Sequence, residues 1–374
     1  MRKVCQSTAL AWALVSAAVI GQAQRTEPPP QGRAPLAEDV FKNVQVLRGI
    51  PVNDFMGTMG IFSAALGMSC EDCHKAGDSN WEAYAADNPR KLMTRSMVVM
   101  MATINKTHFG GRQAVTCFSC HRGTDRPKTT PDLTTLYDAP PPGDPRDILE
   151  QARRSPSPDE VLDKYLQAVG GAARAATLTS LTATGTIVGY GPDSEPRPIE
   201  IAARAPNQRT AVVRSPGGNS VTTFDGRLGW IAAPFRPVPV LQVAGADLDG
   251  LRLDAALMFP ARIKEALRDW RVALPVAIDD REVQVVQGTG AGGLTATLYF
   301  DAETGLLRRQ VRLVDSPVGR IPTSVDYADY REVAGVKIPF SWTVTWLDGR
   351  DRIELSTVQP NVAIDAARFA RPQP

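Results

Sequence analysis

Histidine and cysteine are the scarce residues of this sequence. Its 374 residues include three histidines and five cysteines, and none of either follows residue 121. Thiol and imidazole chemistry is therefore confined to the first third of the chain. Excess charge is scarce too: the formal net charge is +2, and Arg2 and Lys3 supply both units because residues 1–23 contain no acid. A net charge this close to zero does not suggest a nucleic-acid-binding protein, which would need a concentrated basic face.

The first 23 residues have the pattern of a secretory signal peptide. Arg2 and Lys3 form a basic start, an apolar run extends from Leu10 to Ile20, and small residues end it at Gly21-Gln22-Ala23. We expect cleavage there and a mature protein that is periplasmic or secreted. An uncleaved anchor helix is the alternative, but the apolar run is short for a membrane span.

Composition divides the rest of the chain into three predicted parts. Residues 36–124 hold all the histidines and, once Cys5 leaves with the signal peptide, all the cysteines. Residues 125–157 contain seven prolines and few apolar residues, which predicts an extended linker. Residues 158–374 show many short alternating runs separated by turn signals, which favours an antiparallel sheet. We therefore predict a multidomain protein, with an all-α domain followed by an α+β domain whose curved antiparallel sheet has helices on one face.

Helical patterns precede each pair of mature cysteines. The apolar spacing predicts a helix over residues 38–47, and a second that starts at Asn53 or Asp54 and runs to about Leu66. Asn88-Pro89 predicts the start of a third, which runs to about Asn105. In the last part we expect helices over 158–169 and, in two pieces, over 246–269.

Two Cys-x-x-Cys-His motifs carry the chemistry: Cys70/Cys73/His74 and Cys117/Cys120/His121. Two thiols three positions apart on a helical turn meet the two vinyl carbons of one haem, and the adjacent histidine reaches its iron. The motifs use all four mature cysteines and two of the three histidines, so we predict two covalently attached haem c groups. A pair of redox or zinc Cys-x-x-Cys motifs is the alternative, but it leaves both histidines unexplained.

Each haem iron needs a second axial ligand or an open position. Methionine is the leading candidate, because His/Met ligation is common in electron carriers. The helix before the first motif offers Met56 and Met59, and the helix before the second offers Met93, Met97, Met100 and Met101. Spacing alone does not choose among them, since methionine stripes often serve core packing.

Four phrases around these motifs point to a family. They are Phe41-Lys-Asn-Val-Gln-Val-Leu47, Phe55-Met-Gly-Thr-Met59, Ile104-Asn105, and Val115-Thr-Cys-Phe-Ser-Cys-His-Arg-Gly123. Through them, residues 40–124 resemble the cytochrome c subunit of bacterial photosynthetic reaction centres. The resemblance implies that Met59 ligates the first iron and Met97 the second. That family's familiar members carry four haems where this chain has two motifs, so docking onto a reaction centre does not follow.

Residues 158–374 are similar, more faintly, to the lipoprotein-carrier group. The similarity rests on Asp159-Glu-Val-Leu-Asp-Lys-Tyr165, on Phe300-Asp-Ala-Glu-Thr-Gly-Leu306 and on Tyr327-Ala-Asp-Tyr-Arg-Glu-Val-Ala-Gly-Val-Lys-Ile-Pro339. It implies a curved sheet that wraps around helices. A concave sheet can hold a hydrophobic ligand or a docking partner; a purely structural module is the other interpretation, and no binding residue is carried across.

We predict an electron carrier that works outside the cytoplasm between redox protein partners, in the periplasm or at the membrane surface, and not an enzyme. One alternative is a dihaem enzyme such as a peroxidase, which needs an open iron and a nearby acid–base group. His108 is the one histidine left for that role, and we expect it to be a bystander. The other alternative is a ligand carrier centred on residues 158–374.

Secondary roles follow from position. We expect Phe55, Phe62 and Leu66 to form walls of the first haem pocket. Phe118 and Arg122 should border the second haem, where Arg122 can pair with a propionate.

Overall fold

The computed structural model describes residues 34–74, 81–131, 133, 148, 156–189, 194–234 and 236–373. The predicted signal peptide and most of the predicted linker lie outside these residues. We call residues 34–131 the helical lobe and residues 156–373 the sheet lobe; the predicted boundaries at 36–124, 125–157 and 158–374 remain predictions. Within the described part of the chain, no helix is both long enough and apolar enough to cross a membrane.

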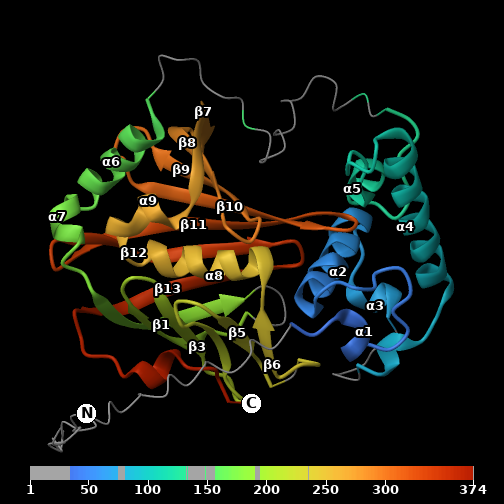
Figure 1. Ribbon diagram of the computed structural model, residues 1–374, viewed down its shortest axis with the longest axis horizontal. Helices are drawn as coiled ribbons and strands as arrows, with labels where there is room; N and C mark the ends of the chain where they lie inside the picture. The colour runs from blue at the N-terminus through green and yellow to red at the C-terminus, as the bar shows by residue number, and fades with distance from the viewer. Residues whose placement is uncertain are drawn as a thin grey trace, which may run out of the picture. The chain divides into compact units, whose positions relative to one another are not determined.

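Two long helices, α2 (Val52–Leu66) and α4 (Pro89–His108), dominate the helical lobe (Figure 1). The shorter helices are α1 (Ala37–Val40), α3 (Cys70–Cys73), η1 (Ala83–Ala85) and α5 (Cys117–His121). At the start of α4, the Asn88 side chain accepts a hydrogen bond from the Lys91 amide, and Pro89 takes the first helical position. This is the start that the sequence predicts. Helix α2 begins slightly before the expected cap, with Pro51 preceding Val52.

One helix prediction is wrong: residues 38–47 are helical only as far as Val40. Asn43 adopts a left-handed φ of +61°, which interrupts any helix through it. Its amide nitrogen donates to the Ala85 carbonyl at 2.8 Å and to the Asp87 carboxylate at 2.9 Å. These contacts hold an irregular loop, from which Leu47 still reaches the core at 5 % exposure. The apolar spacing therefore marked buried positions, not a helix.

The sheet lobe contains a sheet of 13 antiparallel strands among the described residues. The strands are β1 (Ser180–Gly189), β2 (Arg197–Arg204), β3 (Gln208–Val213), β4 (Ser220–Phe224), β5 (Gly229–Ala232), β6 (Val240–Val243), β7 (Arg268–Ile278), β8 (Arg281–Thr289), β9 (Thr295–Asp301), β10 (Leu307–Ser316), β11 (Gly319–Val333), β12 (Val336–Trp346) and β13 (Gly349–Pro360). Strands β6 to β1 form one half, β13 to β7 the other, and β1 pairs with β13 in the middle. This is the curved antiparallel sheet that the sequence predicts.

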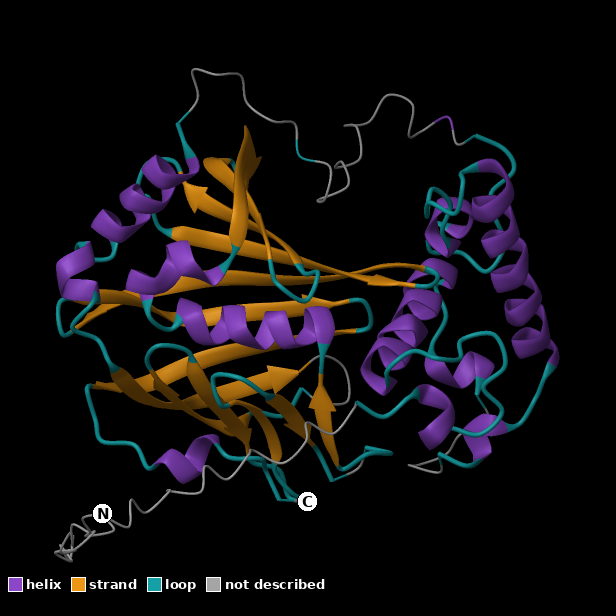
Figure 2. Cartoon of the chain, viewed as in Figure 1, coloured by secondary structure: helices purple, strands orange, loops and turns teal. Residues whose placement is uncertain are grey.

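Helices cover one face of this sheet, as Figure 2 shows. They are α6 (Pro158–Ala168), α7 (Ala172–Ala175), α8 (Gly245–Leu257), η4 (Pro260–Arg262) and α9 (Ile263–Ala266), and η5 (Ala366–Phe369) lies near the end of the chain. Ser157 and Glu160 form a capping box at the start of α6. Leu253, Phe259 and Ile263 are at most 1 % exposed. The segment from α8 to α9 therefore contributes apolar side chains to the core of the sheet lobe.

The turn between β10 and β11 packs against the helical lobe. Val318 in this turn is fully buried in one cluster with Leu47, Ile61, Val98 and Met101. The Cys117 amide donates to the Val318 carbonyl at 3.3 Å. The sheet lobe thereby contacts the start of α5, which is the second Cys-x-x-Cys-His motif.

Candidate haem-attachment sites

The first motif forms the short helix α3. Ser69 stands at the N-terminus of this helix, and its amide and hydroxyl both donate to the Asp72 carboxylate at 2.9 Å. The His74 amide donates to the Cys70 carbonyl at 2.9 Å. One helical turn therefore separates the two thiols of Cys70 and Cys73, which is the spacing that the two vinyl carbons of a haem require.

A cavity of about 250 Å³ opens beside this helix. It is lined by Cys70, Cys73, His74 and Met59 together, so the groups predicted around the first iron share one space. Phe55, Phe62 and Leu66 line the same cavity, as the sequence predicts. Two thiols, an imidazole and a thioether within an aromatic and aliphatic wall make a donor set that fits a haem c group.

Two aromatic residues of this cavity were missed from the sequence, Trp81 and Tyr84. The Tyr84 ring stacks on the His74 imidazole with centroids 4.6 Å apart, and Trp81 contacts Tyr84 at 5.1 Å. In the sequence they are visible only as two aromatic residues between the first motif and Asn88. Nothing in its spacing tied it to the histidine.

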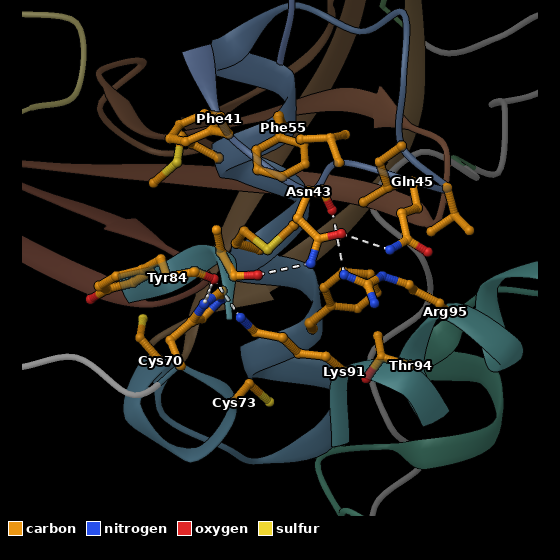
Figure 3. Close-up of a pocket in the computed structure, with 18 of the residues that line it drawn as sticks. Phe41, Asn43, Gln45, Phe55, Cys70, Cys73, Tyr84, Lys91, Thr94 and Arg95 are labelled. Atoms are coloured by element: carbon orange, nitrogen blue, oxygen red, sulfur yellow. Dashed lines mark hydrogen bonds between the residues drawn. The ribbon is translucent and has the colours of Figure 1, made fainter. Parts of the chain in front are cut away.

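The imidazole of His74 is held in one orientation. Its Nδ1 lies 3.1 Å from the Tyr84 carbonyl oxygen, and because a carbonyl can only accept, Nδ1 carries the proton and Nε2 keeps a free lone pair. Burial lowers the pKa of His74, and the nearby Lys91 cation lowers it further. Lys91 Nζ reaches the same carbonyl (Figure 3). It also donates to the Ala86 carbonyl at 2.7 Å. A neutral imidazole with a free Nε2 is the form that binds iron.

The second motif, helix α5, repeats this arrangement. The Thr116 hydroxyl caps the helix by accepting from the Ser119 amide at 3.3 Å. His121 Nδ1 lies 3.0 Å from the Thr124 carbonyl oxygen, so its Nε2 is also left free. Burial raises the pKa of the Cys117 thiol to about 11 and also raises that of Cys73, which keeps both thiols protonated at neutral pH.

Asn105, near the end of α4, holds the segment that leads into α5. Its side chain accepts from the Ala114 and Val115 amides at 3.0 and 2.9 Å and donates to the Val115 carbonyl at 2.7 Å. Asn105 is 7 % exposed, so water does not readily replace these bonds. Its structural role could not be assigned from the sequence, although Asn105 belongs to the Ile104-Asn105 phrase.

The methionine stripe of α4 divides between core and surface. Met101 is 5 % exposed and packs in the core, whereas Met93 and Met100 are 60 % and 47 % exposed. Met97 lies between them and is partly buried; its role as a ligand remains a prediction. His108 ends α4 and is exposed.

The C-terminal end of α2 adjoins both motifs. Gly67 ends this helix at φ +63°, where a Cβ would lie 2.3 Å from the Gly123 carbonyl oxygen. The Gly123 amide also donates to the Ala65 carbonyl at 2.9 Å. Because Cys70 follows Gly67 by three residues and Gly123 follows His121 by two, the two motifs are neighbours at one helix end.

A shared zinc site has no ligand set in this fold. The described residues include the four cysteines of the two motifs and all three histidines, and among the described residues no three His, Cys, Asp or Glu side chains gather as metal ligands. All four cysteines are free thiols. The two motifs are thus available separately.

Comparison with known proteins finds similar sequences over the first third of the chain. Residues 3–135 match the family described as photosynthetic reaction centre cytochrome C subunit. The resemblance seen in the sequence is confirmed there. The subunit of Roseobacter denitrificans is 35 % identical over 112 residues, and that of Thermochromatium tepidum 33 % over 106 residues. Each match covers 27 % of this chain, and 30 % and 25 % of those relatives, so the chain spans less than a third of their length.

A crystal structure of a LolA superfamily protein from Nitrosomonas europaea is similar to 58 % of this chain and 98 % of its own, with 14 % identity and a TM-score of 0.40.

Proposed function

We propose that this protein transfers electrons outside the cytoplasm through two covalently bound haem c groups, each with His/Met ligation. Cys70, Cys73, His74 and Met59 hold the first group, and Cys117, Cys120, His121 and Met97 hold the second. When bound, the haems supply one-electron iron couples. The partners we expect are redox proteins in the periplasm or at the membrane surface.

The observation that carries this proposal is the matched orientation of the two histidines. In both motifs a backbone carbonyl lies within 3.1 Å of Nδ1, which leaves Nε2 free as a ligand. A structural Cys-x-x-Cys pair would have no need to fix an adjacent imidazole in this way. Met59 lines the same cavity as His74, and so do Met56 and Met68. This supports a methionine ligand at the first motif, and the choice of Met59 rests on the family resemblance.

The surrounding residues position and shield these groups. Phe55, Phe62 and Leu66 line the first cavity and limit the access of water. The close approach of Gly67 to Gly123 keeps the two attachment sites near each other, so an electron could pass between the two groups. With thioether ligands on both irons, no position is left open for a substrate.

Optical and magnetic spectra of the ferric protein test the ligation. We expect two low-spin haems with methionine–iron charge-transfer absorption, and no rapid binding of carbon monoxide by the reduced protein at neutral pH. Met59→Ala and Met97→Ala should each convert one haem to high spin. Met56→Ala and Met93→Ala are the matched controls, since each changes a methionine on the same helix, and both haems should stay low-spin.

The outcome that contradicts this ligation is a high-spin signal, or fast carbon monoxide binding, in the unmodified protein. An open iron would instead favour a dihaem enzyme such as a peroxidase.

A further inference from the structure

The segment around the second motif is strongly basic. Residues 106–128 contain five cations and one acid, which gives a formal charge of +4 with histidine neutral. The cations are Lys106, Arg112, Arg122, Arg126 and Lys128, and the acid is Asp125. Residues 24–374 are formally neutral as a whole, so the rest of the mature chain carries the compensating negative charge. The near-zero net charge conceals this local asymmetry.

These five cations are exposed, and none of them forms an ion pair among the described residues. Charges near the first motif behave differently. There Asp72 pairs with Arg90 at 3.1 Å, Glu82 with Lys42 at 2.7 Å, and Asp87 with Arg95 at 2.7 Å. Ion pairing therefore neutralises much of the field beside the first motif, while the field around the second is free to act on a partner.

The basic segment also folds as one end of the helical lobe. The Asn105 side chain ties Ala114 and Val115 to α4, and Figure 1 shows α5 beside the C-terminal part of α4. Within this end, Phe118 and Phe109 are 56 % and 38 % exposed. Phe118 stands between the two cysteines of the motif. Exposed aromatic groups among unpaired charges are the composition of a protein-docking surface.

We propose that residues 106–128 form a docking face for an acidic one-electron redox protein, which exchanges electrons with this chain through the second haem-attachment site. The proposal rests on the proposed electron-transfer function and adds the kind of partner and the point of entry. In each encounter one electron passes between partner and haem iron; one is oxidised, the other is reduced, and no covalent bond forms. Propionates of a bound haem would neutralise part of the basic charge, and Arg122 could pair with one of them, so Arg122 is left unchanged in the test.

The test uses the full chain with haem attached and an acidic flavodoxin as the probe. The Arg126→Glu, Lys128→Glu double variant reverses two charges of the face without touching a proposed haem ligand. The matched control is Lys337→Glu, Arg371→Glu, which makes the same change in net charge on exposed residues of the sheet lobe. Two quantities are measured: binding of oxidised flavodoxin to the oxidised protein, and the rate of haem reduction by flavodoxin hydroquinone.

At low ionic strength, about 20 mM, screening is weak. We expect the face variant to bind the probe at least 10-fold more weakly and to be reduced at least 10-fold more slowly than the unmodified protein, a loss within the range of electrostatic steering. The control should change less than 3-fold, and at about 300 mM salt all three proteins should converge. Equal losses in the face variant and the control, or no salt dependence, would overturn the proposal, because the effect would then follow net charge or no charge at all.

Reduction by dithionite separates this proposal from the function on which it rests. If dithionite reduces both haems of every variant while flavodoxin shows no preference for the basic face, the docking proposal fails and the electron-transfer function stands. If the unmodified protein contains no reducible haem, the function itself fails.

Discussion

Replacement of Asn105 by alanine should destabilise the helical lobe markedly. The side chain makes three hydrogen bonds to the backbone of residues 114 and 115, at 2.7 to 3.0 Å, and is 7 % exposed. Each bond contributes about 1 kcal/mol, and a buried group left without a partner costs more. The variant should therefore lower the free energy of unfolding by about 3 kcal/mol, as measured by guanidinium denaturation followed by far-UV circular dichroism.

Two further variants sharpen this prediction. An ionised aspartate in Asn105→Asp keeps the acceptor for both amides but has no donor for the Val115 carbonyl, so at neutral pH this variant should fall between Asn105→Ala and the unmodified protein. Thr103→Ala is the control, since its exposed hydroxyl bonds only to Val99 within the same helix. A loss below about 1 kcal/mol for Asn105→Ala, similar to that of the control, would refute the assignment of three effective buried hydrogen bonds.

Two remaining predictions concern contacts between α2 and α8 and the β10–β11 turn. Burial and the neighbouring Asp247 raise the pKa of Asp54 to about 6 from its ordinary 3.8. The folded protein thus binds this proton more tightly than the unfolded chain, and the associated stability is present below about pH 4 and lost as the pH rises to about 6. Because Asp54 is only half-buried, solvent screening reduces the effect on stability. We expect Asp54→Asn to raise the free energy of unfolding by about 1 kcal/mol at pH 7.5 and to change it little at pH 4. An equal gain at both pH values would contradict the raised pKa. Val318 is fully buried, so we expect Val318→Ala to lower the free energy of unfolding by about 2 kcal/mol. The control Val276→Ala, at a position that is 45 % exposed, should lower it by less than about 0.5 kcal/mol. Equal losses in the two variants would contradict the packing of the turn.

The sequence was most informative where local chemistry decides the structure. Asn88-Pro89 marks the start of α4 because a polar cap and a proline act within one turn. Pro260 separates α8 from α9 as expected. In β12, buried and less buried side chains alternate from Val336 to Trp342. By contrast, β5 and β6 give little signal in the sequence, because each has four residues and prolines stand between them.

What depends on distant contacts could not be read from the sequence. The loop at Asn43 is fixed by residues 85 and 87, more than forty positions away. Val318, in the β10–β11 turn of the sheet lobe, packs against the helical lobe. No pattern in the sequence around Val318 predicts this contact. For the site, the motifs identified Cys70, Cys73 and His74, while the Tyr84 carbonyl that orients His74 is visible only in the fold. A hydrophobic ligand for residues 158–374 remains a prediction.

The most direct test of the central claim is the number of haems bound covalently to each chain. The protein would be expressed with a haem-attachment system, extracted with acidified acetone to remove loose haem, and measured by pyridine haemochrome absorption and intact mass. We expect two haems per chain, and one in each of the double variants Cys70→Ser, Cys73→Ser and Cys117→Ser, Cys120→Ser. Haem that is extracted from the unmodified protein, or a stoichiometry of one or none, would contradict the account.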